Sequence, residues 1–169
     1  MNKYYTKCIL YAYLSIDAII EQMDKSVEDR AYYSMSDFSP AFDQCLKIIS
    51  LTDRKDVLID LKRLTTEILK TFKLEDLRLL EYKYFRSSEK KRYSDIDFRA
   101  RGYFRKQNKL VEVFSEKLKN RGYTDEWFTS KYLCIDFFKN LYRKVIEIEN
   151  NSYKNPKKNK GVKRLKISA

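Results

Sequence analysis

The stretch that most constrains the fold is residues 97–121, DFRARGYFRKQNKLVEVFSEKLKNR, because it combines an apolar and a basic pattern. Its large apolar side chains recur at the three- and four-residue spacing of one helical face. They are Tyr103, Phe104, Leu110, Val111, Phe114 and Leu118. This pattern predicts a long amphipathic helix over residues 98–121 that buries the apolar face in a core.

A different face of the same predicted helix is basic. Arg101, Arg105 and Lys109 follow one another at four-residue spacing, and we call these three residues the basic row. Like charges at this spacing repel and mildly destabilise an isolated helix, which favours an anionic partner; a solvated lysine-rich surface is the alternative. Gly102 costs a helix about 1 kcal/mol relative to alanine, and close approach of a phosphate or of another helix would explain it.

Composition sets the fold class. The 169 residues include only 3 glycines and 2 prolines, too few chain breakers for the many turns of a β fold, while 14 tyrosines and 10 phenylalanines supply buried area. We therefore predict an all-α fold: a single bundle of about six helices over residues 1–150, followed by a basic, disordered tail over residues 151–169. No apolar run is long enough to span a membrane and no signal peptide is evident, so we expect a cytoplasmic protein.

Helix boundaries are predicted from capping residues. Ser39 followed by Pro40 is expected to start one helix, and Thr52 or Asp53 to cap the next. Gly122 is expected to end the 98–121 helix, and Thr124 to start a short one.

The three cysteines each lie within an apolar pattern without a CxxC pair, so we expect buried thiols and no disulfide framework. They are Cys8, Cys45 and Cys134.

The residue types for common catalysis are missing. The chain has no histidine, which removes the usual general base and zinc ligand, and it has no P-loop, EF-hand loop or dinucleotide-binding motif. The acidic pairs at residues 75–76 and 125–126 fall at predicted helix starts, where the helix dipole favours acids. We therefore expect a protein that is not an enzyme and holds no metal or cofactor.

Charge is segregated along the chain. Residues 86–121 carry 12 basic and 5 acidic side chains, and residues 152–169 carry 7 and none; the rest of the chain has a net charge of −2 out of +12 overall. Such segregation is typical of a surface that binds a polyanion. The candidate nucleic-acid-binding residues are Lys90, Lys91, Arg92, Arg99, Arg101, Gly102, Arg105, Lys106, Lys109, Lys157, Lys158, Lys160, Lys163 and Arg164.

Residues 74–119 contain LRLLEYKYF, a polar loop and SDIDFRARGYFRKQNKLVEVF, an order that resembles the C-terminal DNA-binding region of sigma factors and of phage ArpU-like regulators. The resemblance implies a helix-turn-helix whose second helix reads DNA through Arg99, Arg101, Arg105 and Lys106. We expect a nucleic-acid-binding transcription regulator, with DNA favoured over RNA. The alternative is a helical adaptor or inhibitor that binds an acidic protein surface. Membrane binding is not expected, and the oligomeric state stays open.

Overall fold

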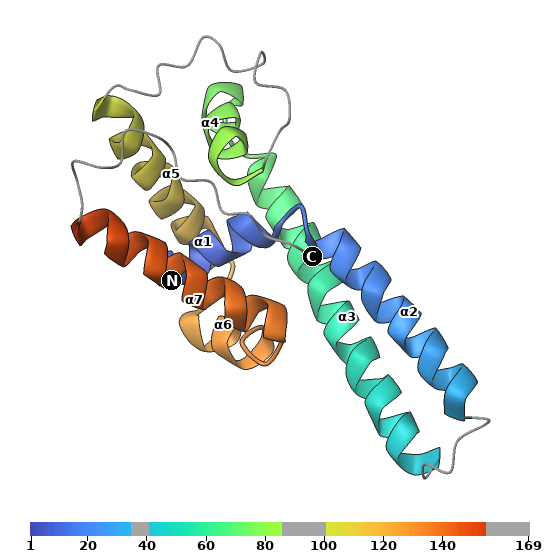
Figure 1. Cartoon of the computed structure of the whole chain (residues 1–169). Helices are drawn as coiled ribbons and strands as arrows, with labels where there is room; N and C mark the ends of the chain where they lie inside the picture. The colour runs from blue at the N-terminus through green and yellow to red at the C-terminus, as the bar shows by residue number, and fades with distance from the viewer. Residues whose placement is uncertain (35–40, 86–100, 155–169) are drawn as a thin grey trace. The chain divides into compact units, whose positions relative to one another are not determined.

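The computed structural model describes residues 1–34, 41–85 and 101–154 (Figure 1). The predicted all-α class is confirmed, because these residues form seven helices and no strand. The helices are α1 (Lys3–Ala12), α2 (Ile16–Ser34), α3 (Ala41–Leu69), α4 (Leu74–Tyr84), α5 (Arg101–Lys119), α6 (Asp125–Lys131) and α7 (Asp136–Lys154). Within these ranges, none of the helices is both long and apolar enough to cross a membrane.

The chain divides into two compact units. Residues 1–13 and 65–168 form the first, which we call the main unit, and residues 14–64 form the second, the helical hairpin. The main unit is thus discontinuous in sequence. Its two pieces are tied together where the chain leaves and returns, by a hydrogen bond of 3.0 Å between the hydroxyl groups of Tyr13 and Thr66.

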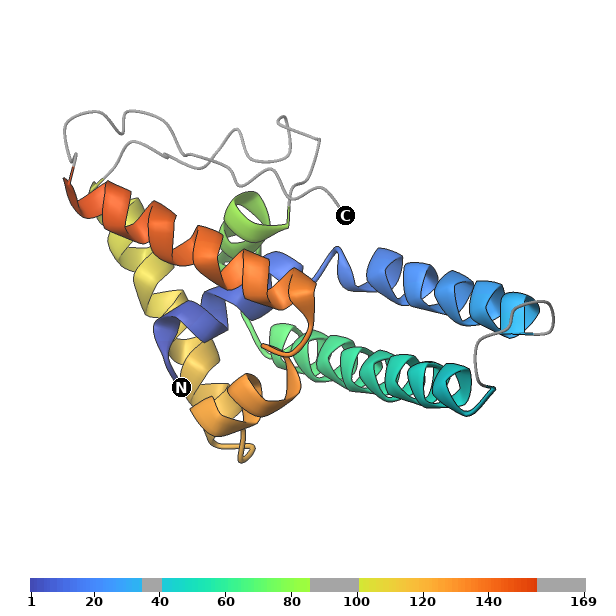
Figure 2. The same ribbon diagram turned by 60° about the horizontal axis from the view of Figure 1, so that its bottom comes forward.

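Helix α1 lies at the centre of the main unit. It packs against α5 and α7, while α4 packs against α5 (Figures 1 and 2). Most of its side chains are buried, namely Thr6, Lys7, Cys8, Ile9, Leu10 and Ala12. A helix buried on all sides belongs inside a core rather than on its surface. The short N-terminal helix, and not the 98–121 helix, is therefore the element around which the main unit is built.

Helix α5 buries the predicted face with one exception. Phe104 is 51% exposed, so its assignment to the core was wrong. It lies at the edge of the apolar arc, next to the basic row on the helical wheel. The middle of the buried arc includes Gln107 instead, whose side-chain amide donates a hydrogen bond to the Leu79 carbonyl and lies 3.4 Å from the Tyr103 hydroxyl.

The end of α5 confirms the role predicted for Gly122. This glycine has left-handed backbone geometry, with φ of 84°. Its N–H donates to the Lys119 carbonyl at 2.9 Å, and the Tyr123 N–H donates to the Leu118 carbonyl at 3.1 Å. These two bonds form a Schellman motif, which satisfies the last carbonyls of the helix. The predicted start of α6 is also confirmed, because the Thr124 hydroxyl accepts a hydrogen bond from the Trp127 N–H at 3.3 Å.

In the helical hairpin, α2 and the first part of α3 run antiparallel, side by side (Figures 1 and 2). Two ion pairs join them: Lys55 to Asp24, and Lys62 to Asp17, each at 2.6 Å. These pairs mark the side of α3 that faces α2.

One boundary prediction was wrong, and so was the predicted burial of two cysteines. Helix α3 continues through the expected cap at Thr52, because the Thr52 hydroxyl donates to the Ile48 carbonyl at 3.0 Å within the helix. Helix α7 runs from Asp136 to Lys154. Cys8 is buried as expected, but Cys45 and Cys134 are exposed. The expected start at residues 39–40 lies outside the described residues.

Candidate functional site

Most of the predicted binding residues lie in segments outside the described ranges. These are Lys90, Lys91, Arg92, Arg99, Lys157, Lys158, Lys160, Lys163 and Arg164. The remaining five fall on α5, where Gly102, Arg105, Lys106 and Lys109 are exposed, and only the backbone of Arg101 is described. The structure therefore brings part of the predicted set together on one helix.

Gly102 lies in open surroundings. A Cβ atom added at this glycine would meet no heavy atom within 4 Å, so no described helix approaches it closely. Of the two explanations offered for a glycine here, packing against a neighbouring helix of the described residues is thereby excluded. Close approach of an external ligand stays a prediction.

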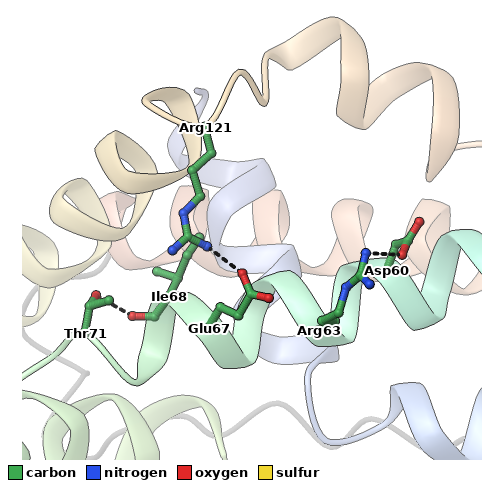
Figure 3. A network of polar contacts seen from close by, with 6 residues as sticks. All are labelled: Asp60, Arg63, Glu67, Ile68, Thr71 and Arg121. Atoms are coloured by element: carbon green, nitrogen blue, oxygen red, sulfur yellow. Dashed lines mark hydrogen bonds and ion pairs between the residues drawn. The ribbon is translucent and has the colours of Figure 1, made fainter.

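Two basic side chains of the 86–121 segment already pair with carboxylates. Lys106 pairs with Asp76 of α4 at 3.4 Å. Arg121, just after α5, pairs with Glu67 in the last turn of α3 at 3.2 Å (Figure 3). These pairs neutralise part of the positive charge and hold the ends of α5 against neighbouring parts of the main unit.

Arg105 and Lys109 are the two members of the basic row whose side chains the structure describes. Both are exposed, and neither forms an ion pair with another described residue. They lie four positions apart and therefore project from the same side of α5, about one helical turn from each other. Because α5 packs against α1 and α4, a rigid scaffold presents both charges.

Phe104 is a surface residue of this site that the sequence pattern did not identify. Its ring lies beside that of Tyr103, with centroids 5.2 Å apart and planes at 77°. An exposed aromatic ring on a basic helix can stack on an unpaired base. Periodicity alone could not separate it from the buried arc, because its angular position is at the arc's edge.

The N-terminus of α5 and the C-terminus of α7 are the points where the chain continues into the two basic segments. The N-terminus of α5 and the C-terminus of α7 lie on the same side in both views (Figures 1 and 2). Residues 86–100 join α5 there, and residues 155–169 follow α7. The predicted contacts within these two segments lie outside the described residues.

A separate polar cluster lies between α1, α4 and α7. Lys7 pairs with Glu149 at 2.7 Å, although Lys7 is almost completely buried. The pKa of Lys83 is lowered to about 8, mainly by burial and also by the nearby charge of Lys7, while Glu149 acts in the opposite direction. The hydroxyl group of Tyr84 is buried and has no hydrogen-bond partner among the described residues. This cluster joins helices inside the main unit and is distinct from the exposed face of α5.

The described residues form no metal-binding site. Within them, no group of three or more His, Cys, Asp or Glu side chains is placed to hold an ion. Burial raises the pKa of the Cys8 thiol to about 12, which keeps it protonated and unreactive. The acidic pairs at residues 75–76 and 125–126 lie in the first turns of α4 and α6, as their dipole role predicts.

Comparisons of the chain with protein-family models, curated proteins and solved structures gave no match. The resemblance to sigma-factor and ArpU-like regions therefore stays a prediction. The segment that would contain the first helix of a helix-turn-helix, between Phe85 and Phe98, lies outside the described residues.

Proposed function

We propose that this protein binds nucleic acid, without catalysing a reaction, through the exposed face of α5 and the basic segments attached beside it. The supporting observation is that the two structural units have net charges of opposite sign. The main unit carries 29 basic and 14 acidic residues, a net charge of +15, whereas the helical hairpin carries 7 and 10, a net charge of −3. A fold in which only one unit has a net positive charge favours an anionic partner for that unit.

The contacts proposed on α5 are to phosphates. Arg105 and Lys109 are exposed and have no carboxylate partner among the described residues, so their charges are available to a backbone of phosphate groups. Gly102 lets that backbone approach the helix where a side chain would intervene. Phe104 adds an aromatic surface for an unpaired base.

The test is the salt dependence of binding. A substitution that removes one phosphate-binding charge should reduce the slope of log K against log salt by about 0.9 for duplex DNA, and by about 0.7 for a single strand. Arg105→Gln and Lys109→Gln should each show this reduction with an unchanged melting temperature. Lys25→Gln, which removes an exposed charge from α2 in the hairpin, is the matched control and should leave the slope intact.

Gly102→Ala provides a second, independent measurement. Alanine should leave stability unchanged or raise it by up to about 1 kcal/mol, because the added Cβ meets open space. Weaker binding at equal or higher stability would support close approach of the ligand at this position. Unchanged binding would remove Gly102 from the proposed interface.

Transcription regulation of the sigma-like or phage type is the finer form of this proposal. It requires that duplex DNA binds more tightly than single-stranded DNA or RNA at the same salt concentration. Preference for a single strand, abolished in Phe104→Ala, would support base stacking instead. Absence of binding to all three would shift support to a helical adaptor with an acidic protein partner, whose carboxylates would repeat the contact that Asp76 makes with Lys106.

A further inference from the structure

The exposed side of α5 carries two neighbouring rows of different chemistry. Phe104 and Asn108 lie four positions apart, and Arg105 and Lys109 of the basic row follow each of them by one position. All four side chains are exposed, and we call these four residues the two-row surface. At about 100° per residue, the charged row lies roughly a quarter of a turn round the helix from the other. Gly102 falls on the side of the charged row, away from Phe104.

Phe104 presents its ring to solvent on a buried support. The ring meets that of Tyr103 at 77°, with centroids 5.2 Å apart, so the two rings touch edge to face. Tyr103 is buried, and its ring also makes an edge-to-face contact with Tyr82 of α4, with centroids 6.4 Å apart. An edge-to-face contact covers at most one face of either ring, and Phe104 is 51% exposed. The ring therefore remains available to an external partner.

The combination of the two rows favours a single strand over a duplex. One exposed phenylalanine is ordinary by itself. Here, however, the ring lies beside two exposed positive charges, which offer a base face and a phosphate separate contacts. A duplex presents phosphates and base edges to a protein, because its base faces are stacked on one another. A single strand presents base faces together with phosphates, and aromatic stacking beside basic side chains is how proteins commonly hold it.

Acidic residues limit the length of this surface. Glu112 and Glu116 are exposed and follow Lys109 on the same side of α5. Their carboxylates repel phosphates, so a strand bound along the charged row should leave the helix after Lys109. The row then offers two contacts about 6 Å apart along the helix axis, a separation that suits neighbouring phosphates of an extended strand.

We propose that the nucleic-acid partner is single stranded where it crosses α5, with one unpaired base stacked on Phe104. Arg105 and Lys109 bind neighbouring phosphates of that strand, and Asn108 lies beside the next base. This inference rests on the proposed function and favours its single-strand outcome over duplex reading. Stacking accepts any base, so binding should depend little on sequence.

Fluorescence anisotropy with oligo(dT), oligo(rU) and duplex DNA at one salt concentration tests the choice of strand. Phe104→Ala should weaken binding of the single strands about tenfold and leave binding of the duplex unchanged, because only an unpaired base stacks on the ring. The dT and rU measurements distinguish DNA from RNA. Phe42→Ala is the matched control, since it removes a phenylalanine that is 71% exposed in the helical hairpin, and it should bind like the wild type.

Salt dependence separates stacking from charge. Phe104→Ala should lower log K for oligo(dT) equally at every salt concentration, because it removes no charge. Arg105→Gln should instead reduce the slope by about 0.7. Phe104→Leu, which keeps an apolar side chain without a ring, should bind as weakly as Phe104→Ala, whereas Phe104→Trp should bind at least as tightly as the wild type.

Tryptophan fluorescence reports stacking directly. The wild type has one tryptophan, Trp127 of α6, which contacts the rings of Tyr123 and Tyr132. Phe104→Trp adds a second, and oligo(dT) should quench the added emission while leaving that of the wild type unchanged. Should Phe104→Ala lower the melting temperature, this quenching still decides the question.

Two results would overturn the inference and leave the proposed function standing. They are tighter binding of the duplex than of both single strands, and single-strand binding that Phe104→Ala does not weaken, provided that Arg105→Gln and Lys109→Gln still reduce the salt slope. Phe104→Trp without quenching on a bound strand would likewise overturn it. Absence of binding to all three nucleic acids would remove both the inference and the proposed function.

Discussion

The ion pair between Lys7 and Glu149 offers the sharpest test of the main unit's energetics. It joins α1 to α7 at 2.7 Å, and its side chains are only 5% and 20% exposed. Removing one partner of a buried pair leaves the other charge without compensation, at a cost of about 3–5 kcal/mol. Glu149→Gln and Lys7→Met are the two perturbations.

The two substitutions should cost different amounts of stability, because the charges they leave behind, on Lys7 and on Glu149, differ in burial. Glu149→Gln leaves the deeply buried ammonium of Lys7 near a second ammonium, that of Lys83, so the destabilisation should be about 4 kcal/mol. Lys7→Met leaves a carboxylate that is closer to water and still attracted by Lys83, so the destabilisation should be about 2 kcal/mol. The double variant Lys7→Met/Glu149→Leu should lie within about 1 kcal/mol of the wild type.

Urea denaturation at pH 7 measures the four stabilities of this double-mutant cycle. The titration of Lys83 supplies a second measurement. Its pKa should fall further in Glu149→Gln and rise in Lys7→Met, because Glu149 raises it and Lys7 lowers it. Single variants that each cost less than about 1 kcal/mol, with additive effects in the double, would refute the claim that this pair is shielded from water.

Three further outcomes are expected. Phe114→Ala should cost about 3–5 kcal/mol, because its side chain is fully buried, whereas Phe104→Ala should cost less than about 1 kcal/mol; thermal melts compare them. Burial lowers the pKa of Lys83 to about 8, so the unfolded chain binds more protons from there up to the usual 10.5. The unfolding free energy should therefore rise with pH across that window, and Lys83→Met should abolish the rise. Thr124→Ala should cost about 1 kcal/mol by removing the cap of α6, measured by urea denaturation.

The parts of the fold that depend on local patterns were predictable. The amphipathic helix α5 and its end at Gly122 follow from residue spacing and from backbone geometry that glycine accepts easily. The continuity of α3 was not predictable, because a threonine hydroxyl can cap a helix or bond within one, and the sequence does not distinguish these at Thr52. The central place of α1 depends on contacts between distant segments.

The candidate site was likewise predictable only where it depends on local residue spacing. The exposure of Arg105 and Lys109 follows from their position off the apolar arc. The neutralisation of Lys106 depends on Asp76, and that of Arg121 depends on Glu67, which are neighbours in space but far apart in the chain. Phe104 was misassigned because a residue at the edge of the apolar arc can lie toward the core or toward solvent.

The discontinuity of the main unit has a consequence for the order of folding events. To bring Tyr13 and Thr66 together, the chain must close a loop that contains the whole helical hairpin, at an entropic cost of roughly 3 kcal/mol for an unstructured segment. Helices α2 and α3 are neighbours in sequence, so their pairing can form before the longer-range contacts. We expect early assembly of the hairpin to shorten this loop and speed the docking of α1, which gives these 51 residues a kinetic role in folding the unit that they interrupt.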